Sequence, residues 1–119
     1  MNDDVEQALR TDRTIDITTT GRASALPRRV EIWFHNVDGT LYITGTPGVR
    51  HWYANLLANP SFTFHLKETT QADLGAKATP ITDGTERRRV LEIITKRVEA
   101  TQPIEEWVKR SPLVRVEFE

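Results

Sequence analysis

The dipeptide Asp38-Gly39 constrains the fold more than any other feature of the sequence, because it separates two segments in which apolar and polar residues alternate. Asp-Gly is typical of a two-residue hairpin turn, whose central residues both need a positive φ angle. Before it, Val30, Ile32 and Phe34 share one face of an extended strand, and residues 40–44 form the returning strand. The sequence therefore predicts an antiparallel hairpin within a mainly antiparallel sheet or small barrel, rather than a doubly wound parallel sheet.

Strand and helix patterns recur along the rest of the chain. Further strands are expected at 14–20, at 62–66 and at 113–118, with a weaker or edge strand at 72–81. Helices are expected at 1–13 (loosely attached), at 51–59 and at two places after residue 83. Their expected inward residues are Trp52, Tyr53, Leu56, Leu57, Val90, Leu91, Ile94, Val98, Ile104, Trp107 and Val108, while Arg87, Arg88, Glu92 and Lys96 are expected to point outward. Asp83-Gly84-Thr85-Glu86 has the spacing of a capping box.

Composition limits the function classes. The 119 residues fit one domain, 1–119, with residues 1–13 as an N-terminal helical segment. A net charge of −1 argues against nucleic acid or an acidic membrane surface as a partner, and no apolar run has the length of a membrane span. We therefore expect a cytoplasmic protein. Without cysteine, the chain has no disulfide, thiolate metal site or thiol nucleophile.

Common catalytic and metal motifs give little signal. The three histidines are scattered without metal-ligand spacing, so no metal site is expected. None of the serines lies in the Gly-x-Ser-x-Gly context of a nucleophile elbow, although a Ser-His-Asp triad would show only in three dimensions.

Arginines gather in the connection between the first two predicted strands. Residues 18–29 contain Arg22, Arg28 and Arg29, several hydroxyl groups and Gly21. A guanidinium offers two parallel hydrogen bonds to a phosphate, and free backbone N–H groups in such a turn add donors. This pattern indicates an anion site, and the alternative is a solvated hairpin loop.

A second informative segment covers residues 44–53. Thr44, Gly45 and Thr46 end a strand in small residues, which would let a flat ring lie against the backbone. Arg50 and Trp52 follow at the start of a helix, whose N-terminus favours anions. The alternative is an ordinary turn with Trp52 as a core residue.

Together these segments resemble a known family. The motif Thr18-Thr19-Thr20-Gly21-Arg22-x-Ser24-x-x-Pro27-Arg28, the Asp38-Gly39 hairpin and Trp52-Tyr53-x-Asn55-Leu56-x-Ala58-Asn59-Pro60 are similar to the deazaflavin-dependent nitroreductase family. That family belongs to the FMN-binding split β-barrels related to pyridoxamine 5'-phosphate oxidase. The resemblance runs from about Ile15 to the last strand. It implies an α+β split β-barrel of six or seven mostly antiparallel strands with flanking helices.

The resemblance also implies an activity and a site. Its members bind coenzyme F420, or FMN in related groups, and pass a hydride to a small electron-poor acceptor such as a quinone or a nitroaromatic. By position, the implied cofactor-binding residues are Arg22, Ser24 and Arg28 at the phosphate, Thr44, Gly45 and Thr46 facing the ring, and Trp52 near the ring or acceptor. No catalytic side chain is assigned. The resemblance further implies a homodimer.

Two residues depart from the family's turn. Ala23 stands where a basic residue is common, and Ala25 where glycine is common. We expect Ala25 to divert the turn, because glycine reaches positive φ angles more easily. Arg29 and Arg50 are the cations available to compensate at the phosphate. The alternatives to an F420 oxidoreductase are an FMN flavoprotein and a non-catalytic split barrel with a degenerate cofactor site.

Overall fold

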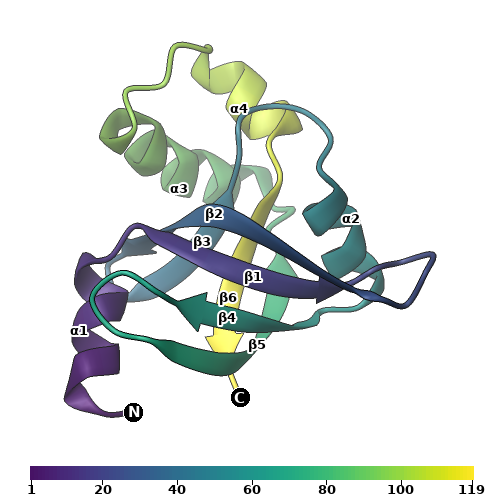
Figure 1. The fold of residues 1–119 in the computed structure, drawn as a ribbon. Helices are drawn as coiled ribbons and strands as arrows, with labels where there is room; N and C mark the ends of the chain where they lie inside the picture. Colours follow the sequence, from purple (N-terminus) through teal and green to yellow (C-terminus); the bar gives the residue numbers. More distant parts are fainter.

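The computed structural model describes residues 1–119 as a closed barrel of six antiparallel strands with four helices around it (Figure 1). The elements are α1 Asp3–Thr11, β1 Thr14–Thr20, β2 Pro27–Val37, β3 Thr40–Thr44, α2 His51–Ala58, β4 Ser61–Leu66, β5 Ala72–Pro80, α3 Gly84–Arg97, α4 Ile104–Arg110 and β6 Leu113–Phe118. Around the barrel the strands follow the order β1-β2-β3-β6-β5-β4. The predicted split barrel and its antiparallel character are confirmed.

Strand β2 is the longest strand and pairs with two neighbouring strands in succession. Its residues 27–33 pair with β1, and its residues 34–37 pair with β3. The edge of β2 that faces away from β1 over residues 27–33 therefore has no strand partner. The predicted hairpin that follows is confirmed, since Asp38 and Gly39 have φ angles of 54° and 90°.

The barrel interior is filled by apolar side chains and covered at two places by helices. Helices α1 and α2 lie at opposite sides of the barrel in Figure 1. Val5, Ala8 and Leu9 of α1 and Trp52 and Leu56 of α2 belong to the same buried cluster as the inward residues of the strands. The expectation of a loosely attached N-terminal helix was wrong, because α1 contributes buried apolar surface to the interior of the barrel.

Helices α3 and α4 form a second layer on the outside of the barrel (Figure 1). Val90, Leu91, Ile94 and Trp107 pack there against Tyr42 and other residues that point out of the barrel. The predicted cap is confirmed, since the Asp83 side chain accepts a hydrogen bond from the Glu86 N–H at 2.9 Å.

Arg87 was expected to point into solvent, and this was wrong. Its guanidinium donates hydrogen bonds to the carbonyl oxygens of Ile81, Trp107, Val108 and Ser111. Three of these carbonyls belong to the last turn of α4 and its C-terminal cap, where helix carbonyls run out of backbone donors, although the Trp107 carbonyl also accepts from the Ser111 N–H. Arg87 therefore joins α3 to the C-terminal end of α4, where a cation is favourable.

Two smaller expectations also fail. Leu57 was assigned to the inward side of its helix, but it is 55% exposed, because Trp52, Asn55 and Leu56 form the buried side of α2. The strand expected at 72–81 is confirmed as β5, but it is not an edge strand, because β5 pairs with β4 on one side and β6 on the other. None of the helices combines the length and the apolar composition that crossing a membrane requires.

Candidate functional site

The arginine-containing turn between β1 and β2 is held by its own backbone. The Gly21 N–H donates to the Leu26 carbonyl, and the Ala25 N–H donates to the Gly21 carbonyl, both at 2.8 Å. Ala25 itself takes the left-handed conformation in this turn, with a φ angle of 59°. A left-handed conformation costs a residue with a Cβ about 1–2 kcal/mol, so Ala25 lowers the stability of the turn relative to a glycine.

Asn55 of α2 fixes this turn from the side. Its Oδ1 accepts hydrogen bonds from the backbone N–H of Arg22 at 3.1 Å and from the Arg22 guanidinium at 3.3 Å. Its Nδ2 donates to the Thr19 hydroxyl at 3.1 Å. Both Asn55 and Thr19 are buried. Asn55 belongs to the helix motif of the sequence, but the motif does not predict its contact with the turn. That contact depends on the position of α2 beside the turn.

Several donors of the turn have no partner within the chain. The backbone N–H groups of Ala23 and Ser24 make no hydrogen bond, and neither does the guanidinium of Arg28. The Ser24 hydroxyl accepts from the Leu26 N–H at 3.2 Å, which leaves its own proton free. Unpartnered N–H groups and guanidinium groups at one turn are the donors that bind phosphate.

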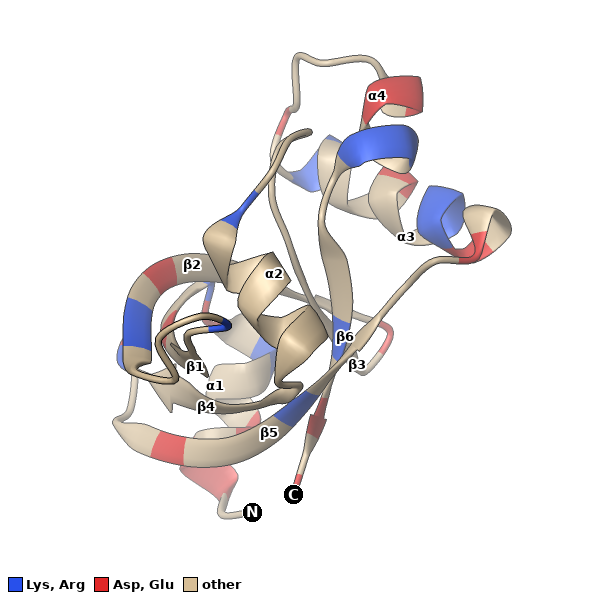
Figure 2. Cartoon of the chain, turned by 90° about the vertical axis from the view of Figure 1, so that its right-hand side faces the viewer, with Lys and Arg blue, Asp and Glu red and all other residues tan.

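These donors surround a cavity of about 420 Å³, which we call the turn cavity. It is lined by Thr19, Gly21, Arg22, Ala23, Ser24, Arg28, Val30, His51, Trp52 and Asn55. Four of the seven predicted site residues therefore lie together: Arg22, Ser24, Arg28 and Trp52. No carboxylate lines the cavity, and helix α2, which borders it, carries no Lys, Arg, Asp or Glu (Figure 2). The field in the turn cavity therefore favours an anion.

The absence of a side chain at Gly21 allows Ser24 and Leu26 to approach its backbone closely. A Cβ atom on Gly21 would lie 2.5 Å from the Ser24 hydroxyl oxygen and 3.2 Å from the Leu26 carbonyl oxygen. Ser24 would then have to move, so the glycine is needed for close approach rather than for its φ angle.

The two candidate compensating cations are engaged elsewhere. Arg29 points to the other face of β2 and pairs with Asp16 at 2.9 Å. Arg50 donates to the Thr46 carbonyl and hydroxyl and to the Val49 carbonyl, so it holds its own loop together. Neither of them lines the turn cavity. Arg22 and Arg28 are its two arginines.

The remaining predicted residues, Thr44, Gly45 and Thr46, line a different cavity of about 450 Å³, which we call the strand-end cavity. Its other lining residues are Trp33, His35, Ile94, Val98, Glu99, Ala100, Thr101, Gln102 and Trp107. Strand β2 contributes to both cavities, with Arg28 and Val30 at one end and Trp33 and His35 at the other. The predicted site is therefore split into two parts along β2.

The strand-end cavity is electrostatically unlike the turn cavity. No lysine or arginine lines it. Burial, followed by the nearby charges of Arg97 and Arg13, lowers the pKa of His35 from 6.5 to about 4. His35 is therefore neutral at pH 7. The Arg13 guanidinium lies 5.4 Å from the centre of the Trp33 ring and covers part of that indole.

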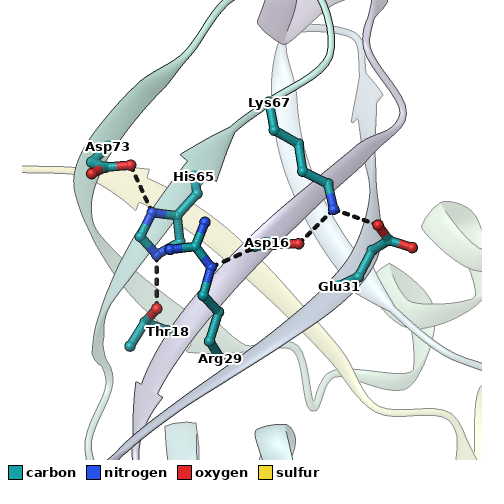
Figure 3. Close-up of polar contacts among 7 residues, drawn as sticks. All are labelled: Asp16, Thr18, Arg29, Glu31, His65, Lys67 and Asp73. Carbon is teal, nitrogen blue, oxygen red and sulfur yellow. Dashed lines mark hydrogen bonds and ion pairs between the residues drawn. The ribbon is translucent and has the colours of Figure 1, made fainter.

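A hydrogen-bonded chain on the outer barrel surface was not predicted (Figure 3). Thr18 Oγ1 lies 2.7 Å from His65 Nε2, and His65 Nδ1 lies 2.7 Å from Asp73 Oδ1. The order of groups is that of a hydroxyl–imidazole–carboxylate triad, but the Asp73 side chain is 75% exposed and none of the three residues lines the turn or strand-end cavity. The chain joins β1, β4 and β5 across the barrel surface. Its members are 47 and 8 residues apart, so spacing gave no signal.

Asp16 organises a second cluster beside this chain (Figure 3). It pairs with Arg29 at 2.9 Å and with Lys67 at 2.7 Å, and Lys67 also pairs with Glu31. The Lys67 ammonium is the main cause that lowers the pKa of Asp16. These charges satisfy one another, so they leave no cation free for a ligand.

Solved structures show the same fold at low sequence identity. A pyridoxamine 5'-phosphate oxidase-like protein from Listeria innocua is 15% identical, with a TM-score of 0.73 over 98% of this chain and 92% of that one. A 5-nitroimidazole antibiotic resistance protein from Bacteroides thetaiotaomicron is 18% identical, with a TM-score of 0.64 over 98% and 78%. A FAD-binding protein from Mesorhizobium loti is 17% identical, with a TM-score of 0.63 over 96% and 86%.

Sequence comparison gives the more specific result. No curated protein matches the chain. The family model of the F420H(2)-dependent quinone reductase matches residues 2–119, nearly the whole sequence. This agrees with the resemblance drawn from the turn and helix motifs. The chain belongs to the F420H(2)-dependent quinone reductase family.

Proposed function

We propose that this protein binds coenzyme F420 and catalyses hydride transfer from the reduced coenzyme to a small electron-poor acceptor. The observation that carries the proposal is the turn cavity, where the guanidinium of Arg28 and the N–H groups of Ala23 and Ser24 have no partner within the chain. Membership of the family supports F420 as the ligand. The residues present fit a phosphate-bearing cofactor, because they provide donors and no competing carboxylate.

Each part of the site has a separate task. Arg22, Ser24 and Arg28 hold the phosphate, and Asn55 keeps Arg22 in place through the contacts described above. When bound, the reduced deazaflavin supplies a hydride, and the acceptor also takes up one proton. Thr44, Gly45 and Thr46 line the strand-end cavity, where their backbone would face the ring. The chain therefore binds, orients and shields the reactants, and the redox chemistry belongs to the cofactor.

FMN is the second candidate for the same site. A flavin with a single phosphate would use the same donors in the turn cavity. The FAD-binding protein from Mesorhizobium loti shares this fold, which supports a flavin as an alternative. A split barrel that binds neither cofactor is the remaining possibility.

Titration of the purified protein with F420 and with FMN, followed by cofactor fluorescence, tests the proposal. We expect F420 to bind more tightly than FMN, and the substitution Arg28→Gln to weaken F420 binding roughly ten- to a hundredfold, the loss of one charge-assisted contact. Arg89→Gln is the matched control, because Arg89 is exposed on α3 and lies outside both cavities. If neither cofactor binds below about 1 mM, the oxidoreductase proposal is wrong.

A further inference from the structure

A third cavity, of about 680 Å³, lies between α2, the end of α4 and residues 81–87, and we call it the basic cavity. It shares no lining residue with the turn cavity or the strand-end cavity. Backbone hydrogen bonds tie its walls together: the Gly48 N–H donates to the Arg110 carbonyl at 3.1 Å, and the Ile81 N–H donates to the Leu113 carbonyl at 3.0 Å. Its volume lies within the range of about 300–1,000 Å³ that is typical of small-molecule sites.

The charged residues that line the basic cavity are all cations: Arg50, Arg87, Lys109 and Arg110. Figure 2 shows in blue the basic segments before α2 and at the end of α4 that border it. The guanidinium groups of Arg50 and Arg87 donate only to neutral oxygens, so no ion pair neutralises their charges. Arg110 pairs with Glu106 at 3.0 Å, and Lys109 forms no ion pair. The field in the basic cavity therefore favours an anion.

Lys109 is the cation at this cavity that has free donors. It is exposed, and its ammonium group makes no hydrogen bond within the chain. A lysine carries three donors on a flexible four-carbon stem, so it can adjust to an anion without a fixed direction in the free protein. A carboxylate accepts such charge-assisted hydrogen bonds more strongly than a neutral oxygen does. Lys109 can therefore hold an anionic head group, while Arg50 and Arg87 contribute charge.

Apolar side chains at the same cavity are left uncovered. Val49 is 93% exposed, the highest exposure among the large apolar residues of the chain, and Leu57 is 55% exposed. Ala54, Ile81 and Pro112 extend the apolar part of the lining. A ligand with an aliphatic chain would remove this surface from water, which favours its binding. A small inorganic anion would leave the same surface exposed.

We propose that the basic cavity binds an amphipathic carboxylate of the class of medium-chain fatty acid anions, with its carboxylate at Lys109 and its aliphatic chain against Val49 and Leu57. The confinement of the apolar surface to one cavity favours such a small molecule over an acidic protein segment, because a stable protein interface covers about 800 Å² of each partner. This binding goes beyond the proposed function and does not depend on F420, since the basic cavity is separate from both parts of the cofactor site.

Calorimetric titration with decanoate and with decan-1-ol, both below micelle formation, tests this assignment, because the two probes share one aliphatic chain and differ in the charge of the head group. We expect decanoate to bind more tightly than decan-1-ol. Lys109→Gln should weaken decanoate binding roughly three- to tenfold and leave decan-1-ol binding unchanged. Leu57→Ser should weaken the binding of both probes, because it removes apolar surface that either chain would cover. Added salt should weaken only decanoate binding.

Lys96→Gln and Leu26→Ser are the matched controls and should leave decanoate affinity unchanged. Lys96 is an exposed lysine on α3, Leu26 is 56% exposed, and neither lines the basic cavity. Equal affinity for the two probes, no decanoate binding below about 1 mM, or equal losses in Lys109→Gln and Lys96→Gln would overturn the assignment.

The substitution Arg28→Gln separates this site from the turn cavity. It should weaken F420 binding and leave decanoate binding unchanged, because Arg28 lines only the turn cavity. Loss of decanoate binding in Arg28→Gln would place the carboxylate in the turn cavity and overturn the assignment. A protein that binds decanoate at the basic cavity but neither F420 nor FMN would contradict only the proposed function.

Discussion

The Asn55 side chain receives two hydrogen bonds from Arg22, one from its backbone N–H at 3.1 Å and one from its guanidinium at 3.3 Å. One amide oxygen of helix α2 thus fixes both the path of the turn and the direction of its first arginine. The opposite end of the same amide donates to the buried Thr19 hydroxyl. If the turn binds phosphate as proposed, a single side chain couples that binding to the stability of the fold.

Asn55→Ala should consequently lower both properties. The substitution removes these three hydrogen bonds and leaves the Thr19 hydroxyl buried without its partner, which we expect to cost about 1–3 kcal/mol in the free energy of unfolding. F420 affinity should fall as well, because Arg22 loses its support. Urea unfolding and F420 titration measure the two effects. Asn59→Ala is the control, because Asn59 is exposed and its side chain makes no hydrogen bond; an equal loss in both variants would contradict this role.

Ala25→Gly should stabilise the protein. Ala25 has a φ angle of 59°, and glycine reaches this conformation without the Cβ penalty, so we expect a gain of about 0.5–1 kcal/mol. Ala23 in the same turn has no positive φ angle, so Ala23→Gly should lower the stability, because glycine adds conformational freedom to the unfolded chain. Thermal unfolding of the two variants checks the expected opposite signs. A higher melting temperature for Ala23→Gly than for Ala25→Gly would contradict the conformation of the turn.

Arg87→Lys should destabilise the outer helical layer although the charge is kept. Arg87 donates to four carbonyl oxygens through three different nitrogen atoms, and a lysine ammonium cannot reproduce that geometry. We expect a loss of about 2–3 kcal/mol in the free energy of unfolding. Arg89→Lys, an exposed position on the same helix, should change it by less than about 0.5 kcal/mol. Chemical denaturation followed by circular dichroism gives both values.

His35 should make stability depend on pH in a defined window. Its pKa is lowered from 6.5 to about 4 in the folded chain, so the unfolded chain takes up a proton first as the pH falls. The free energy of unfolding should therefore decrease as the pH falls below 6.5 and continue to decrease toward about 4. Denaturant titrations between pH 7 and about 5 test this, since carboxylates contribute mainly below that range. The slope should become smaller in His35→Gln, and an unchanged slope would contradict the neutral, buried imidazole.

Much of the fold follows from local patterns. The Asp38-Gly39 turn, the extended strand before it and the cap at Asp83 depend on residues close together in the chain, and all three are confirmed. The family motifs also placed Arg22, Ser24 and Arg28 in one turn, and the structure brings them together around one cavity.

The failures concern contacts between distant segments. Arg87 has the spacing of an exposed helical residue, and only the position of α4 brings the Trp107, Val108 and Ser111 carbonyls within its reach. The separation of Thr44–Thr46 from the turn cavity depends on how far β2 extends beyond its pairing with β1. The ordering of Thr18, His65 and Asp73 likewise depends on the strand register, which no local pattern encodes.

Oxidation of reduced F420 by menadione, followed by the return of deazaflavin absorbance after adding the protein, tests the central claim most directly. We predict that the protein accelerates the reaction well above its uncatalysed rate, that Arg28→Gln raises the F420 concentration needed for half-maximal rate, and that Arg89→Gln leaves it unchanged. A rate equal to that without protein, at F420 concentrations that saturate its binding, would contradict the assignment of this split barrel as an F420-dependent reductase.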